Sequence, residues 1–201
     1  MKLYYTPGAC PLAVHILLCE LGLPHELVKV DLKTKKLEDG GDYLAVNPKG
    51  YVPALVLDSG DTITEIPAIV QHLADTHPDA GLLAAPGQLE RTRAIEWLTF
   101  AGTELHRSFS PLFNPNASDD LKQASRERLA MRFGYLNQAL EGKAYLLGER
   151  FSVADPYIFT ILNWTFIQKI DLAPWGNLAA YHQRVAQRPS VQAAMRAQGL
   201  I

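Results

Sequence analysis

The spacing of apolar residues divides the chain into two parts. In the first part, short apolar runs bounded by turn residues alternate with helical patterns, which predicts a βαβ unit followed by a ββα unit. The expected strands are 2–5, 26–32, 54–57 and 62–64, and the expected helices are 11–21 and 65–77. This order of elements is typical of a small α/β domain.

A segment rich in proline and glycine, residues 78–87, separates this part from the rest of the chain. Beyond it, apolar residues recur three and four apart, which predicts a helical bundle. Helices are expected over 88–113, after Ser118 and after Ser152, with two short ones near the end. We therefore expect an α/β domain at 1–80, a linker at 81–87 and an all-helical domain at 88–201.

Composition and charge limit the kinds of partner and the compartment that we expect for the protein. Of the 201 residues, 48% are hydrophobic and 20% charged, and the formal net charge is −2. This near-neutral balance does not favour nucleic acid or anionic membranes as partners. No apolar run is long enough to span a bilayer, and the strand that follows Met1 leaves no place for a signal peptide. Only two cysteines occur, which fits a reducing compartment, so we expect a cytoplasmic protein without a disulfide or a metal site.

Cys10 lies where the first strand turns into the first helix. Pro11 suits the first helical turn, so the positive end of the helix dipole is expected to favour the thiolate of Cys10. Ala13 stands where a Cys-X-X-Cys motif would have its second cysteine, which excludes a local dithiol cycle. The alternative is an inert, packed cysteine. Cys19 follows apolar residues at helical spacing and is interpreted as packing.

Two prolines mark further candidate features. Pro53 precedes a strand, and a cis bond there would leave the backbone N–H and C=O of Val52 free to pair with an extended ligand. A trans proline at an edge strand is the alternative. Glu65 precedes a helix with Pro67 in its first turn, so free N–H groups there would hold a carboxylate and Glu65 an ammonium. An acidic residue that only stabilises the helix N-terminus explains the same pattern.

On the helix after the linker, mostly polar residues form a column beside the apolar seam: Thr99, Thr103, His106, Ser110 and Phe113. The column lacks the lysine and glutamate of a solvated face, so it is interpreted as the wall of a cleft. His106 would serve there as donor, proton acceptor or cationic partner of a thiolate, or only as a structural histidine. Ser152 and Asp155 match a capping box and are assigned to structure.

Taken together, these motifs resemble the cytosolic glutathione S-transferases, and the bacterial beta class most closely. The resemblance covers essentially the whole chain. It rests on residues 5–10, on the Asn-Pro-Lys-Gly-Tyr-Val-Pro-Ala-Leu block at 47–55, and on the segments 64–65, 104–106 and 151–155.

The resemblance implies a thioredoxin-like N-terminal domain with a cis-Pro53, an all-helical C-terminal domain, and a homodimer. It implies that Cys10 contacts the sulfur of glutathione, that Val52 pairs with its cysteinyl unit, and that Glu65 and the N–H of Ile66 hold its γ-glutamyl end. Lys35 would meet the glycyl carboxylate. His106 would lie near the sulfur, with Thr99, Thr103 and Glu104 lining the site or reaching it from the partner subunit.

Three residues depart from what is frequent in that family: Ile66 replaces serine or glycine, Thr99 replaces asparagine and Arg107 replaces lysine. Ile66 removes a hydroxyl but keeps its backbone N–H, so altered affinity for glutathione is expected at an intact site.

The activity expected is transfer of glutathione to a hydrophobic electrophile, with the thiolate of glutathione stabilised by Cys10 and His106 and no permanently bound cofactor. Phe109, Phe113 and Trp164 are expected to form the electrophile pocket. Two alternatives remain: a glutathione-dependent reductase or peroxidase that forms a mixed disulfide at Cys10, and a non-catalytic carrier of hydrophobic compounds or of a protein partner.

Overall fold

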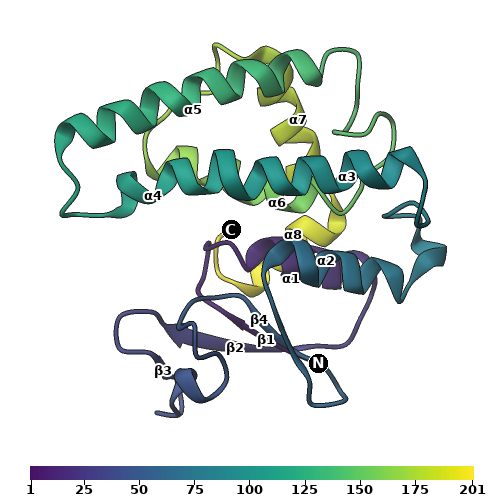
Figure 1. Ribbon diagram of the computed structural model, residues 1–201, viewed down its shortest axis with the longest axis vertical. Coiled ribbons are helices and arrows are strands. Elements are labelled where there is room, and N and C mark those ends of the chain that lie inside the picture. The colour runs from purple at the N-terminus through teal and green to yellow at the C-terminus, as the bar shows by residue number, and fades with distance from the viewer. The chain divides into compact units, whose positions relative to one another are not determined.

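A computed structural model describes the whole chain, residues 1–201. Two compact units make up the chain (Figure 1). The first comprises Met1–Gly81 together with Gln187–Ile201, and the second is Leu82–Ala186. No helix in either unit has the length and apolar character that crossing a membrane requires.

The first unit is built on a five-stranded mixed sheet with the strand order β3-β2-β1-β4-β5. The strands are β1 (Lys2–Tyr5), β2 (Glu26–Asp31), β3 (Lys36–Leu37), β4 (Ala54–Val56) and β5 (Thr62–Thr64). β1 runs parallel to β2 and antiparallel to β4, and both β4–β5 and β2–β3 are antiparallel. This confirms the expected thioredoxin-like domain. The two-residue β3 is too short for an alternating pattern to predict.

Helices and side chains cover both faces of this sheet. Helices α1 (Leu12–Glu20) and α2 (Ile66–Asp75) lie on one side of it (Figure 1), and the short η1 (Tyr43–Ala45) and η2 (Pro78–Ala80) complete the unit. Because side chains alternate along a strand, Leu3 and Leu55 are buried on one face, whereas Tyr4 and Ala54 on the other pack with Tyr43.

The chain end corrects the expected domain boundary. The helix α8 (Pro189–Ala197) packs against α1 and belongs to the first unit, not to a helical domain at 88–201. Arg188 and Ser190 both donate hydrogen bonds to the carboxylate of Glu20 at the end of α1. The physical reason is the sequence of α1, which is buried from Leu12 to Leu18 without a polar face and therefore needs a second cover besides the sheet.

The second unit contains only helices. They are α3 (Leu89–Phe100), η3 (Ala101–His106), α4 (Arg107–Phe113), α5 (Asp119–Ala139), α6 (Asp155–Ile167) and α7 (Gly176–Ala186). Ser118 caps α5 as expected, since its hydroxyl accepts from the N–H of Leu121 at 3.3 Å. Helix α6 is buried around most of its circumference and forms the core of the unit.

The segment η3 is a π-helix within the continuous run from α3 to α4. A π-helix bonds residue i to i+5 and so adds a residue to the turn. The regular 3.6-residue spacing that underlies the expected polar column therefore does not hold between Thr103 and His106.

Candidate functional site

Cys10 lies in the turn between β1 and α1, beside the start of β4. Its thiol donates a hydrogen bond to the carbonyl of Val52 at 3.3 Å, and only 9% of the residue is exposed. The bond between Val52 and Pro53 is cis, as expected. Among the hydrogen bonds within the protein, none uses the N–H of Val52. The thiol of Cys10 therefore lies beside the backbone of Val52, whose N–H is left unpaired by the rest of the protein.

The protonation state of Cys10 differs from the expectation. Burial raises the pKa of the Cys10 thiol to about 12, although a backbone hydrogen bond opposes this shift. The helix N-terminus cannot outweigh the loss of hydration, because α1 begins only at Leu12 and Cys10 lies two residues before it. At neutral pH the residue is a thiol, and it acts as a hydrogen-bond donor rather than as a free thiolate.

Alkylation tests this assignment. In a Cys19→Ser variant, which retains Cys10 alone, iodoacetamide should react at neutral pH at least about tenfold more slowly than with free cysteine. The rate should keep rising with pH beyond about pH 10, because the thiolate fraction of a group with a pKa of about 12 is still increasing there. A rate that levels off near or below neutral pH would contradict the buried-thiol assignment.

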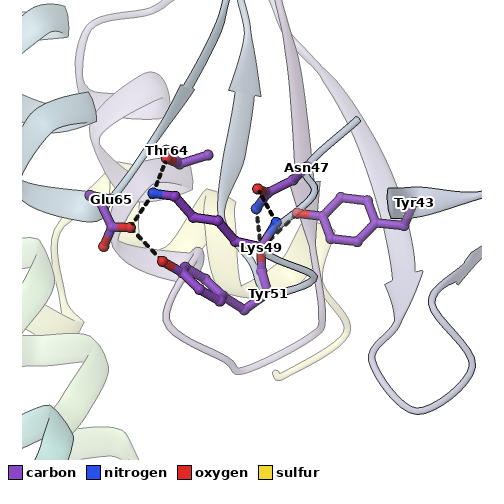
Figure 2. Close-up of polar contacts among 6 residues, drawn as sticks. All are labelled: Tyr43, Asn47, Lys49, Tyr51, Thr64 and Glu65. Atoms are coloured by element: carbon purple, nitrogen blue, oxygen red, sulfur yellow. Dashed lines mark hydrogen bonds and ion pairs between the residues drawn. The ribbon is translucent and has the colours of Figure 1, made fainter. Parts of the chain in front are cut away.

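The loop before Val52 is held by buried polar side chains (Figure 2). The hydroxyl of Tyr43 and the amide of Asn47 both donate to the carbonyl of Tyr51, at 2.8 and 2.6 Å. Tyr43 is fully buried and Asn47 is 2% exposed. Since these two side chains come from η1 and the turn that follows it, they fix the backbone that presents Val52.

Glu65 lies at the N-terminus of α2 with a φ of 69°, a conformation that costs a non-glycine residue about 1–3 kcal/mol. Lys49 donates to its Oε1 at 2.7 Å and the hydroxyl of Tyr51 to the same atom at 2.6 Å, as Figure 2 shows. These two donors lower the pKa of Glu65. Oε2 of Glu65 and the N–H of Ile66 have no hydrogen-bond partner within the protein.

This arrangement gives α2 adjacent acceptor and donor groups. One oxygen of the Glu65 carboxylate already accepts a hydrogen bond from the ammonium of Lys49. The second oxygen can accept one from the ammonium of a ligand in the same way. The N–H of Ile66 lies at the positive end of the helix, where an anion is stabilised. The site therefore suits a zwitterionic group. The ammonium of Lys35 donates to the carbonyl of Gly50 at 2.6 Å and so lies beside the same loop.

In the second unit, His106 ends the π-helix and faces α6. Its Nδ1 lies 2.8 Å from the hydroxyl of Tyr157, and its ring contacts that of Trp164 with centroids 4.8 Å apart. Burial lowers the pKa of His106. The imidazole is therefore neutral at neutral pH, which removes the cationic role from those expected for it.

Glu104 lies on the same π-helix but faces α5. Its Oε2 accepts from Arg132 Nε at 2.8 Å and Nη2 at 2.6 Å. The structure therefore does not bring Glu104 and His106 to one face. Thr99 and Thr103 are exposed, and each hydroxyl donates to a carbonyl of its own helix four residues earlier. Of Thr99, Thr103 and Glu104, only Glu104 pairs with a charged side chain, that of Arg132.

The expected electrophile pocket is also changed. Phe109 is fully buried and packs against Trp164 and Phe133, so it belongs to the core and cannot line an open pocket. Trp164 is 5% exposed, and Phe113 is 45% exposed. Trp164 touches both His106 and Phe113. Of the three aromatic residues, Phe113 alone presents a substantial surface.

Asp155 is buried completely and receives four hydrogen bonds. The donors are the N–H of Leu146, the N–H and hydroxyl of Ser152, and the hydroxyl of Tyr181. Burial raises the pKa of Asp155 although these donors oppose the shift. The structural assignment of Ser152 and Asp155 agrees with these contacts, but α6 begins at Asp155, later than a capping box predicts.

Four residues near these groups had no role assigned from the sequence: Lys49, Tyr51, Tyr157 and Arg132. Lys49 and Tyr51 belong to the block that carries the resemblance, but their contact with Glu65 joins residues about fifteen positions apart. Tyr157 stands 51 residues from its partner His106. The regular spacing of residues within one helix or strand does not indicate such contacts between residues of different elements.

These features define a class of protein: a thioredoxin-like domain with a thiol beside a cis-proline loop, joined to a helical domain. The sequence matches the family models of the glutathione S-transferase N-terminal domain over residues 9–76 and C-terminal domain over residues 100–189. Glutathione S-transferase GstA of Escherichia coli O157:H7 is 49% identical over 200 residues, all of both chains.

Solved structures agree. The bacterial beta class glutathione S-transferase of Sphingomonas chungbukensis is 50% identical with a TM-score of 0.96, and a sphingomonad glutathione S-transferase complexed with glutathione is 48% identical with a TM-score of 0.95. Each alignment covers all of both chains. This chain therefore belongs to the glutathione S-transferase family, and its similarity to the beta class confirms the expected class.

Proposed function

We propose that this enzyme transfers glutathione to hydrophobic electrophiles, with glutathione bound along the loop that ends at Val52. The observation that carries the proposal is the backbone of Val52, whose N–H is unpaired and whose carbonyl accepts only the Cys10 thiol. An extended peptide can pair with both groups as an added strand does. The sphingomonad relative bound to glutathione supports the choice of ligand.

The neighbouring groups match the rest of glutathione. The N–H of Ile66 would hold the carboxylate of the γ-glutamyl unit, and the free Oε2 of Glu65 would hold its ammonium. Lys35, already beside the carbonyl of Gly50, would reach the glycyl carboxylate. Each charged end of the ligand thus has a partner of opposite charge or a helix N-terminus.

The thiol of Cys10 would stabilise the glutathione thiolate by donating its proton in a hydrogen bond. With its pKa raised to about 12, Cys10 keeps that proton while the glutathione sulfur loses its own. The hydrogen bond to Val52 is then exchanged for one to the ligand sulfur, and the Val52 carbonyl becomes free for the cysteinyl N–H. Such a charge-assisted bond is stronger than the neutral bond it replaces.

His106 would supply a second donor to the sulfur. If the hydroxyl of Tyr157 donates to Nδ1, the ring proton lies on Nε2. Tyr157 is 4% exposed and would thereby act as a positioning residue. The neutral ring, whose pKa burial lowers, donates without forming an ion pair. Phe113, which is 45% exposed and packs against Trp164, would provide apolar surface for the electrophile.

Two substitutions at Cys10 test the proposal. Cys10→Ala removes the donor and should lower kcat/KM for glutathione and a halonitroarene by about tenfold. Cys10→Ser keeps a donor and should stay within about threefold of wild type, because a hydroxyl replaces the thiol hydrogen bond.

The outcomes separate the alternatives. Equal and complete loss in both variants, together with a glutathione adduct on wild-type Cys10 that dithiothreitol removes, would indicate the covalent, disulfide-reducing function instead. Absence of conjugation in the wild type with binding of hydrophobic compounds unchanged in Cys10→Ala would indicate a carrier.

We also propose that the protein is a homodimer in the cytoplasm. Trp97, Phe100 and Tyr135 form an aromatic group on α3 and α5, beside the Glu104–Arg132 ion pair. These residues surround a surface cavity of about 340 Å³. Aromatic residues with arginine are typical of association surfaces. Both cysteines are free, which supports a reducing compartment.

A further inference from the structure

A second group of reactive side chains lies outside the proposed glutathione site. His15 and Cys19 are one turn apart on α1, and His25 follows the loop that leads into β2. One ligand atom from each of the three lies within 4.8 Å of the others. In a tetrahedral zinc site with bonds of about 2.0–2.3 Å, ligand atoms are about 3.5 Å apart. Side-chain rotations that move the ligand atoms by about 1 Å would therefore bring all three within bonding distance of one ion.

The loop from α1 to β2 aims His25 at the helix. Gly22 has a φ of 64°, and its N–H donates to the carbonyl of Cys19 at 3.1 Å, so the chain reverses directly after α1. Nδ1 of His25 lies 2.7 Å from the carbonyl of Leu23. Only a protonated Nδ1 can donate to a carbonyl, so Nε2 of His25 keeps its lone pair. This is the tautomer that metal-binding histidines use.

The proton of His15 is fixed by Gln198 near the chain end. The N–H of Gly8 donates to Oε1 of Gln198 at 3.1 Å, which leaves the amide nitrogen of Gln198 to donate to Nδ1 of His15, also at 3.1 Å. Nε2 of His15 is therefore the remaining atom for a metal. When Nε2 binds a metal, Nδ1 carries the ring proton. The amide of Gln198 would then turn over so that its oxygen accepts that proton, and the hydrogen bond from the Gly8 N–H to Oε1 would be lost.

We propose that His15, Cys19 and His25 form a zinc site that ties α1 to the start of β2. His15 is 2% exposed and anchors the site, whereas Cys19 and His25 are partly exposed and give the ion access from solvent. One thiolate and two imidazoles are ligands that zinc prefers, and water completes the tetrahedron. On binding, the thiol of Cys19 releases its proton to solvent as the sulfur–zinc bond forms.

Titration of the full chain with zinc chloride, after removal of metals by a chelator, tests the site. We expect one zinc ion per chain and a thermal unfolding midpoint that rises with zinc. Cys19→Ser and His25→Ala should each weaken zinc binding by about 100-fold or more, since loss of a residue that only supports a ligand costs about 10–100-fold. Both residues are partly exposed, so these variants should fold.

The matched control is His72→Ala, which removes a partly buried histidine of α2 that is not one of the three ligands and should leave zinc binding unchanged. Cobalt(II) added in place of zinc should give a thiolate charge-transfer band that Cys19→Ser removes and Cys10→Ser retains. Equal zinc affinity in wild type and Cys19→Ser would overturn the proposal, as would a band that depends on Cys10.

Gln198→Glu provides a second, opposite test. A carboxylate accepts from both the Gly8 N–H and the protonated Nδ1 of His15 without turning over, so zinc should bind about tenfold more tightly. Weaker zinc binding in a folded Gln198→Glu variant would contradict ligation through Nε2 of His15. If this variant fails to fold, the Cys19→Ser and His25→Ala comparison alone decides the proposal.

Discussion

Replacing Asp155 with alanine should lower the free energy of unfolding by about 3–5 kcal/mol. The side chain is fully buried and accepts hydrogen bonds from Leu146, Ser152 and Tyr181. Its removal leaves three of the four donors without an acceptor, because only the Tyr181 hydroxyl also reaches the backbone carbonyl of residue 155, at 3.3 Å. Each such donor costs about 1–3 kcal/mol when nothing relaxes around it. Urea unfolding followed by tryptophan fluorescence measures the loss.

Ser152→Ala is the matched control for this experiment. It removes one hydroxyl and leaves the Ser152 N–H and the other donors on Asp155, so a loss of about 1 kcal/mol is expected. A similar effect of the two substitutions would show that Asp155 acts only through Ser152. In that case its contacts with Leu146 and Tyr181 would contribute little to stability.

Replacing Glu65 with glycine should weaken glutathione binding by about 10–100-fold while the protein stays folded. The loss follows from the free Oε2, the proposed partner of the ligand ammonium, since hydrogen bonds to charged groups are worth about 1.5–3 kcal/mol. Glycine adopts the φ of 69° without a Cβ clash, which offsets the exposed contacts with Lys49 and Tyr51 that the variant loses. Calorimetric titration with glutathione measures the affinity.

Lys49→Met serves as the control for Glu65. It removes the ammonium bound to Oε1 but leaves the carboxylate and the N–H of Ile66, so the affinity should change by less than about fivefold. A larger loss in Lys49→Met than in Glu65→Gly would mean that Lys49, rather than Glu65, binds the ligand. Thermal unfolding of both variants distinguishes a lost contact from a lost fold.

Features governed by neighbours in the sequence could be predicted from it. The turn after β1, the hairpin of β4 and β5 and the Ser118 cap each depend on a few consecutive residues. The motif blocks add the cis bond at Pro53, which the structure contains. The same blocks point to Val52, Glu65 and Ile66 because all three lie at element ends, where backbone groups are left unpaired.

Features governed by distant contacts could not be predicted. The docking of α8 depends on Glu20, whose partners Arg188 and Ser190 lie 168 and 170 residues away. The pKa of Cys10 was expected to fall because only the helix N-terminus is visible in the sequence, whereas burial by the folded chain dominates. The partners of Glu104 and His106 are likewise distant in sequence, since Arg132 donates to Glu104 and Tyr157 contacts His106.

The most direct test of the account is the ionisation of glutathione bound to the enzyme, followed by the ultraviolet absorbance of its thiolate as pH is raised. We predict that the bound thiol titrates at least about one pH unit below the value of about 8.5 for a free cysteine thiol. The Cys10→Ala variant should move this value upward, because the hydrogen bond from Cys10 stabilises the charged form. A bound thiol that titrates at or above the free value in the wild type would contradict stabilisation of the thiolate by this site.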